Sequence, residues 1–338
     1  LLVGTDSTGT LSSADGNTGV GIGVFAALTS GDDNVAVGKD ALKANTTGAT
    51  NVAVGKDALL ANTTASQNVA IGSLSSVTTT TGCKNTAVGH GSFYNNSTGD
   101  NNTALGNFAL NDNTTADNNT AVGYFALKAN TACGNLTAVG YGALCTNSTG
   151  TNNTAIGHAS LDANTSGSAN IALGTDALGA NTSAGEGTAV GYHALCSNTT
   201  GQSNTAVGMR ALCSNTTGAS NVAVGKGALE TNTTGAENTA VGFCALILST
   251  TGSANAAFGA LALDANTTGG ANVALGNETL GFNTTGDNNT AVGFAALYKN
   301  TTANENTAVG YRALQENTTG ADNVAVGFCA LKTNTTGP

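Results

Sequence analysis

Tryptophan is absent from this chain, proline occurs only at Pro338, and charged residues make up 9% of the sequence. Aromatic residues account for 4%. Alanine, valine and leucine supply most of the apolar content, and binding pockets are usually lined by larger and aromatic side chains. Such a composition can fill a narrow core, and it argues against a wide enclosed pocket.

Basic residues are also scarce. Ten Lys and Arg stand against twenty Asp and Glu, for a net charge of −10, and they form no cluster. Neutralising a phosphate backbone requires basic clusters, so nucleic acid is not an expected partner. No run of about 18 apolar residues occurs, so we expect no membrane insertion.

The sequence is instead dominated by a seventeen-residue repeat. Asn221 opens the unit N-V-A-V-G-K-G-A-L-E-T-N-T-T-G-A, and related units open at Asn238 and Asn272. From Asn34 to Asn323, eighteen units follow one another without insertion or deletion. Their residues are numbered below as repeat positions one to seventeen, counted from Asn34. A fixed step repeated this often is typical of solenoids, in which each repeat stacks on its neighbours.

The chain is predicted to be a single domain. Residues 1–33 contain only degraded copies of the unit and are expected to form irregular entry coils of the same solenoid. Residues 34–338 carry the regular repeat, with no linker or change of composition.

The predicted fold is all-β, a parallel β-solenoid (β-roll) of about 20 coils. Seventeen residues cannot hold two helices, and glycine in every unit would break them. Repeat positions two to four are β-formers around alanine, and an A-L run follows the glycine. N-T-T-G is typical of turns. We therefore expect two short strands and two turns per coil, and a stack on the order of 95 Å long.

Two faces of the predicted strand differ in their side chains. Position three is alanine and position five is glycine in all eighteen regular units, whereas position four is always apolar. Alternate residues of a strand face opposite sides. We expect positions two and four to face the core. The small face indicates close approach of another wall, either the opposite side of a flat coil or a partner chain.

The pattern N-T-A-V-G-Y-x-A-L-x-x-N-T-T-G resembles repeats of tail-fibre-like proteins of phages and bacteria. Asn204–Gly208 and Asn306–Gly310 are clean examples of N-T-A-V-G. The pattern is similar, more loosely, to the left-handed β-roll heads of trimeric autotransporter adhesins. This resemblance covers essentially the whole chain. It implies a homotrimeric extracellular or virion-surface fibre that touches a host or surface receptor.

Position six carries a discontinuous row of aromatic and histidine side chains, the predicted contact stripe. It would bind a receptor, a glycan or a neighbouring chain. The alternative is an ordinary β-favouring surface, because lysine, serine and threonine occupy the same position in other units. The members are His90, Tyr124, Tyr141, His158, Tyr192, Phe243, Phe294, Tyr311 and Phe328.

Cys196 and Cys213 share position ten in consecutive units. Adjacent coils place equivalent positions about 4.8 Å apart, within the roughly 4.4–6.8 Å Cα window of a disulfide. We expect the two residues to lie side by side, and to form a disulfide if the protein is extracellular. The alternative is two reduced surface thiols. With seven cysteines in the chain, at least one remains unpaired or bonds another chain.

No catalytic, cofactor or metal site is predicted. His90, His158 and His193 lie in surface positions of different coils, and His90 and His158 are roughly 19 Å apart. Catalytic triads and metal centres need neighbouring groups in fixed geometry. The seven cysteines form no C-x-x-C pair. We therefore expect a protein that is not an enzyme and that binds no cofactor.

Asparagine at position twelve opens N-x-[S/T] in most units, a possible glycosylation signal. Its regularity favours a ladder of amides that hydrogen-bond from coil to coil. We expect these asparagines to be largely unmodified.

The leading functional prediction is a rigid fibre shaft or adhesin for attachment to a host or surface. The alternative is a self-assembling extracellular filament whose subunits stack end to end through uncapped coils. A minor alternative is an ice-binding solenoid, because pairs such as Thr46-Thr47 and Thr63-Thr64 could form threonine ladders.

Overall fold

The computed structural model describes residues 2–3 and 13–337 and comprises two compact units, Leu1–Ala169 and Asn170–Pro338. Within the described residues the secondary structure consists of twenty short parallel strands, without helices. The prediction of an all-β parallel solenoid with one seventeen-residue repeat per coil is confirmed. The described part of the chain accordingly holds no helix long and apolar enough to cross a membrane.

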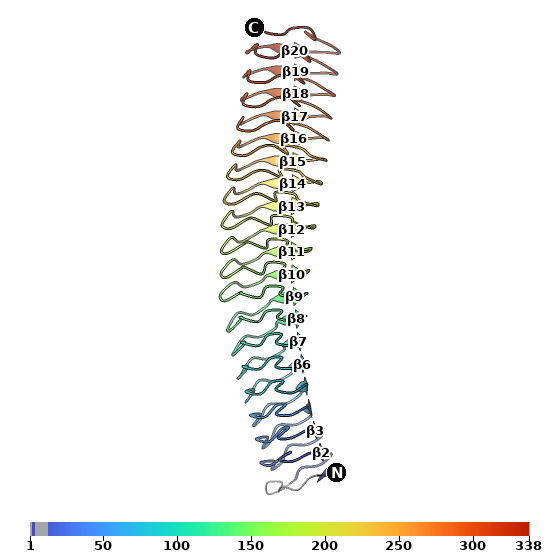
Figure 1. Ribbon diagram of the computed structural model, residues 1–338, viewed down its shortest axis with the longest axis vertical. Helices are drawn as coiled ribbons and strands as arrows, with labels where there is room; N and C mark the ends of the chain where they lie inside the picture. The colour runs from blue at the N-terminus through green and yellow to red at the C-terminus, as the bar shows by residue number, and fades with distance from the viewer. Residues whose placement is uncertain (1, 4–12, 338) are drawn as a thin grey trace. The chain divides into compact units, whose positions relative to one another are not determined.

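In each unit the strands stack in chain order, one strand per coil (Figure 1). Those of the first unit are β1 Leu2–Val3, β2 Thr18–Val20, β3 Val35–Val37, β4 Val52–Val54, β5 Val69–Ile71, β6 Thr86–Val88, β7 Thr103–Leu105, β8 Thr120–Val122, β9 Thr137–Val139 and β10 Thr154–Ile156. Those of the second are β11 Ile171–Leu173, β12 Thr188–Val190, β13 Thr205–Val207, β14 Val222–Val224, β15 Thr239–Val241, β16 Ala256–Phe258, β17 Val273–Leu275, β18 Thr290–Val292, β19 Thr307–Val309 and β20 Val324–Val326.

The strand register repeats the sequence step. Thr205 of β13 pairs with Val222 of β14, and Val222 pairs with Thr239 of β15. The same stacking continues outside the strands, where the Thr216 amide donates to the Thr233 carbonyl at 2.9 Å. Much of each coil is therefore hydrogen-bonded to its neighbours, which a solenoid of single-strand coils requires.

The prediction of two strands per coil is wrong. Only positions two to four are extended, and the A-L run lies in a turn. Leu229, at position nine, takes a φ of 51°. This left-handed conformation is incompatible with a strand, and it directs the leucine inward, where it is fully buried.

The predicted orientation of the strand faces is also wrong. Ala223, at position three of β14, is fully buried, whereas Val222 and Val224 on either side are not. The core of the coil consists instead of alanine at positions three and eight, leucine at position nine, and asparagine at positions one and twelve. Valine faces outward because the flat interior has room only for a methyl group at position three.

The face that carries alanine at position three packs against the opposite side of the same coil. Of the two predicted alternatives, the opposite side of the coil or a partner chain, the structure shows the first. Gly19 replaces the usual alanine at position three, and Phe25 replaces the usual leucine at position nine. A Cβ on Gly19 would lie 3.1 Å from the Phe25 ring and 2.9 Å from Val24 Cγ1. The larger side chain thus occupies the space that the glycine leaves, as close packing demands.

Glycine at position five has a different cause. Gly225 has a φ of 133°, a region that side-chain-bearing residues rarely adopt, and its missing Cβ would lie 2.7 Å from the Gly242 carbonyl carbon. The equivalent glycines of successive coils therefore stack with their backbones in close contact. A methyl group has no space at this position.

The asparagine ladder predicted at position twelve is confirmed, and position one forms a second. Asn232 is fully buried, and its Nδ2 donates to Asn215 Oδ1 of the preceding coil at 2.8 Å and to the Gly235 carbonyl at 3.0 Å. Asn238 forms the same kind of link to Asn221 at 3.2 Å. A buried side chain cannot accept a sugar in the folded protein, so we still expect these residues to be unmodified.

Ser249 interrupts the position-twelve ladder. Among the described residues, Asn232 Oδ1 and Ser249 Oγ are both buried without a hydrogen-bond partner. In the Ser249→Asn variant, Nδ2 would donate to Asn232 Oδ1, and Oδ1 would accept from Asn266. We expect the variant to be more stable by about 1–3 kcal/mol, because buried unpaired groups are costly. Denaturant unfolding measures the gain, with Ser183→Asn on the surface as control. An unchanged or lowered unfolding midpoint would contradict it.

The predicted irregular region, residues 1–33, lies partly outside the described residues. Residues 13–33 include β2, which pairs with β3 in the regular register. Val24, Phe25 and Leu28 of this segment are buried and belong to the same core cluster as Ala36 and Leu42.

Candidate functional site

The predicted contact stripe divides into short stacks. In the first unit the Tyr124 and Tyr141 ring centroids are 5.5 Å apart, and those of Tyr141 and His158 are 5.2 Å apart, with nearly parallel planes. In the second unit Phe294, Tyr311 and Phe328 stack in the same way. His90 meets Phe108 edge-on, and Phe108 in turn meets Tyr124 edge-on. Of the other members, Tyr192 stacks on His193, and the Phe243 ring centroid lies 5.9 Å from the Lys226 ammonium.

Stacking determines what the stripe presents to a partner. A ring with a ring above and below it shows its edge to solvent, whereas sugar recognition by stacking requires an open aromatic face. Tyr141 is 56% exposed even though it stacks between Tyr124 and His158. Tyr141 therefore offers its edge and hydroxyl group, and the role of the stripe as a contact surface remains a prediction.

Cys196 and Cys213 lie in consecutive coils with their sulfur atoms 2.7 Å apart, and both are free thiols in the structure. Cys213 is buried and Cys196 is partly exposed. The hydrogen bond from the Cys213 thiol lowers the pKa of the Cys196 thiol to about 6, against the opposing effect of burial. The same hydrogen bond, together with burial, raises the pKa of Cys213. Cys196 is therefore the thiolate of the pair at neutral pH, and the nucleophile.

This geometry predicts a selective disulfide. With oxidised glutathione, the Cys196 thiolate would attack the glutathione disulfide and release one glutathione, and Cys213 would then displace the second. We expect two of the seven thiols to disappear under native conditions, which thiol counting and peptide mass spectrometry measure. Cys213→Ser should instead retain a mixed glutathione disulfide on Cys196. Loss of thiols elsewhere while this pair stays reduced would refute the prediction.

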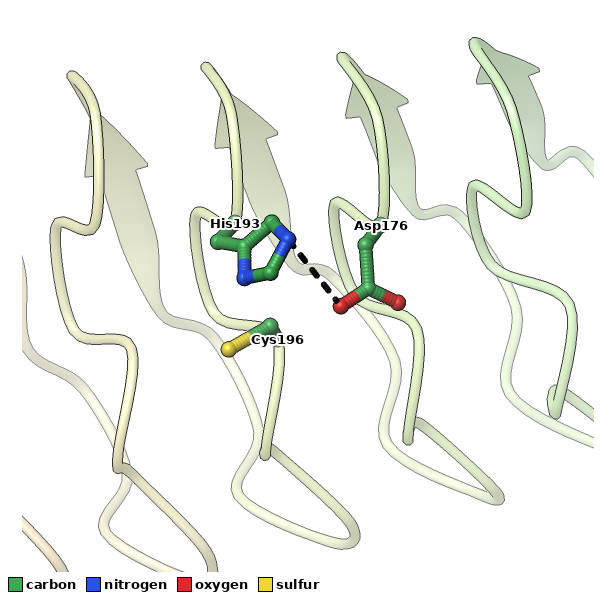
Figure 2. Close-up of side chains that lie close together, drawn as sticks. All are labelled: Asp176, His193 and Cys196. Carbon is green, nitrogen blue, oxygen red and sulfur yellow. Dashed lines mark ion pairs between the residues drawn. The ribbon is translucent and has the colours of Figure 1, made fainter.

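A second group of side chains adjoins this cysteine pair. Asp176, His193 and Cys196 each offer a ligand atom, and these atoms all lie within 4.8 Å of one another. Figure 2 shows His193 and Cys196 on one coil and Asp176 on the preceding coil. His193 Nε2 is 3.8 Å from Asp176 Oδ2, and their side chains are 31% and 39% exposed. The group is thus accessible from solvent.

Sequence reasoning placed His193 in isolation and missed this group. Asp176 and His193 share position seven in consecutive coils, so the seventeen-residue step already makes them neighbours. Cys196 joins them because positions seven and ten of one coil meet across the turn, as the Asp40–Lys43 ion pair at 3.1 Å shows. The sequence shows the spacing of three residues between His193 and Cys196, but it does not show that the turn brings their side chains together.

The outward face of the strands is the third candidate site. Positions two and four carry no charged residue in any regular coil, and position four is always Val, Ile, Leu or Phe. These side chains are partly exposed: Val207 by 36% and Leu275 by 49%. We call this surface the apolar strand face. Its apolar part is the column at position four, because position two is threonine in ten of the eighteen regular coils. Exposed apolar surfaces mark interaction sites.

Models of protein families give no match to this chain, and neither do the curated proteins. The candidate sites are therefore interpreted from their own geometry.

Proposed function

We propose that the chain is the shaft of an extracellular fibre or adhesin, of phage tail-fibre or trimeric-adhesin type, and that it assembles as a homotrimer through the apolar strand face. The observation that supports this proposal is the outward column of apolar residues at position four. A solvated surface repeated in eighteen coils would have accumulated charges, yet none occurs at positions two or four.

A second copy of this chain is the partner that fits best. The face repeats with the same step along each unit, so an identical chain laid alongside matches it coil for coil. The ion pairs of the described residues lie outside the strand face, at positions six, seven, ten and eleven. Lys56–Asp57 and Lys299–Glu316 are examples. The strand face can therefore be covered without burying charge, which an interface core requires.

The proposed role of the shaft is attachment to a host or surface. It would carry a receptor-contacting region away from the particle or cell surface, and the contact stripe would be its own candidate contact surface. No step of this role requires catalysis.

Size-exclusion chromatography with light scattering, followed by electron microscopy, tests the assembly. We expect discrete particles with about three times the 32.7 kDa mass of one chain. The double variant Val207→Glu, Val224→Glu should dissociate them into monomers, because it would bury like charges between the chains. The matched control Thr217→Glu, Thr234→Glu changes two exposed residues of the same coils outside the strand face.

The other outcomes decide against the trimeric shaft. Unlimited fibres would favour the end-to-end filament, and a wild-type monomer would refute self-association through the strand face. An assembly that both double variants leave intact would place the interface elsewhere. Thermal hysteresis of the purified protein would favour the ice-binding alternative.

A further inference from the structure

We propose that Asp176, His193 and Cys196 form a binding site for a divalent transition-metal ion of the zinc type, with Cys213 as the fourth ligand. This inference does not depend on the proposed shaft function. The residues offer one carboxylate, one imidazole and two thiol groups, the donor types that zinc takes in protein sites.

The distances allow a single ion to reach all three first ligands. Zinc binds oxygen and nitrogen at about 2.0–2.2 Å and sulfur at about 2.3 Å, so its tetrahedral ligand atoms lie roughly 3.3–3.8 Å apart. The three ligand atoms here are within 4.8 Å of one another, and His193 Nε2 is 3.8 Å from Asp176 Oδ2. Side-chain rotations that move each ligand atom by about an ångström or less bring the three atoms to bonding distance from one ion.

Cys213 is the candidate fourth ligand because of its contact with Cys196, although its sulfur lies outside the 4.8 Å group formed by the other three residues. The Cys196 sulfur points away from Asp176 toward the following coil (Figure 2), where Cys213 lies. The two sulfur atoms, now 2.7 Å apart, would separate by about an ångström to bind one ion. The four ligands then come from three consecutive coils, so that the ion would bridge them.

The charges around the group are compatible with a cation. Arg210 is the nearest basic residue at position seven, and its Nε lies 2.7 Å from Glu230 Oε1, which neutralises it. Asp176 supplies negative charge, a metal ion displaces the protons of its cysteine ligands, and neither His193 nor Asp176 is enclosed. An ion can therefore enter from solvent without meeting an unpaired positive charge.

Cobalt(II) titration of the reduced full-length chain tests the site, with a phosphine reductant that does not compete for metal. We expect saturation at one ion per chain, with a thiolate-to-cobalt charge-transfer band and the intense d–d bands of tetrahedral cobalt. Cys196→Ser, His193→Ala and Asp176→Ala should each weaken binding at least tenfold. Cys213→Ser should bind more weakly and lose about half of the charge-transfer intensity. An unchanged band in Cys213→Ser would exclude the fourth ligand.

Cys244→Ser and His90→Ala are the matched controls, since each removes a ligand type at least two repeat units away from the site residues in the sequence, and both should bind cobalt as the wild type does. Circular dichroism of the metal-free variants checks that they fold. Alkylation of the wild-type chain tests the site without any variant. Zinc should protect Cys196 from alkylation more than it protects Cys244. Absence of saturable binding by the reduced wild type, or unchanged binding by Cys196→Ser, would overturn the proposal.

Discussion

Replacing Gly140 by alanine is expected to lower the free energy of unfolding by about 3–5 kcal/mol, through overpacking together with backbone strain. Gly140 follows β9 and has a φ of 136°, and an added Cβ would lie 2.7 Å from the Gly157 carbonyl carbon of the next coil. The obstacle is backbone, which cannot rotate away. Relief requires the two coils to separate, at the expense of the hydrogen bonds between β9 and β10.

Gly142→Ala in the same coil is the matched control. Gly142 also has a positive φ, 63°, but nothing lies within 4 Å of an added Cβ. Ala159 occupies the equivalent position of the next coil with a φ of 50°, so alanine is compatible with this conformation. We expect a loss of about 1 kcal/mol.

Thermal unfolding and hydrogen exchange measure the difference. Long repeat arrays need not unfold in two states, so the exchange rates of the β9 and β10 amides give the local effect. Equal protection of these amides in the Gly140→Ala and Gly142→Ala variants would show that close backbone stacking does not explain the glycines of position five.

Replacing Asn238 by leucine is expected to cost on the order of 3–6 kcal/mol, because several buried groups lose their partners at once. Asn238 Nδ2 donates to the Gly252 carbonyl at 2.8 Å, and Oδ1 accepts from the Asn255 amide at 3.0 Å and from Asn255 Nδ2 at 3.1 Å. Leucine fills a similar volume but satisfies none of these groups, so the effect isolates the hydrogen bonds from the packing.

Asn277→Leu is the control for a surface asparagine. Asn277 is exposed, and the hydrogen bond from its side-chain amide to the Ala260 carbonyl is also exposed. Its loss should change stability by less than about 0.5 kcal/mol. Leu136 occupies position one naturally, and its side chain can accept no hydrogen bond. A loss for Asn238→Leu no greater than that for Asn277→Leu would therefore mean that the ladder is dispensable.

The repeat length was sufficient to predict the coil, the strand register and the neighbours of every residue one step away. The alternation of side chains along a strand correctly placed Ala223 on one face of β14 and Val222 and Val224 on the other. It did not determine which of the two faces is buried in the core. The interior volume decides that question, and it admits only alanine opposite leucine. The turn that contains Leu229 was read as a strand because left-handed backbone is rarely expected for leucine.

The same limits apply to the candidate sites. The seventeen-residue step brought Cys196 and Cys213 together in the prediction, and it could equally have paired Asp176 with His193. Joining the two pairs required the geometry of the turn between positions seven and ten. That geometry depends on the positive φ of residues such as His193, 54°, which no spacing rule supplies.

The coil-to-coil ladders have a consequence for how the length of such a chain can change. Because each coil presents the same backbone groups to the coil after it as the preceding coil does, removing residues 221–237 would join Ser220 to Asn238 and leave the strand register and the backbone ladders of the same kind, with the loss of the Arg210–Glu230 ion pair. A deletion one residue longer or shorter would leave one coil a residue too short or too long, and this coil could not join the ladders on both of its sides. Length is therefore expected to vary among natural versions of this gene in whole repeats, with intermediate lengths eliminated as misfolded products.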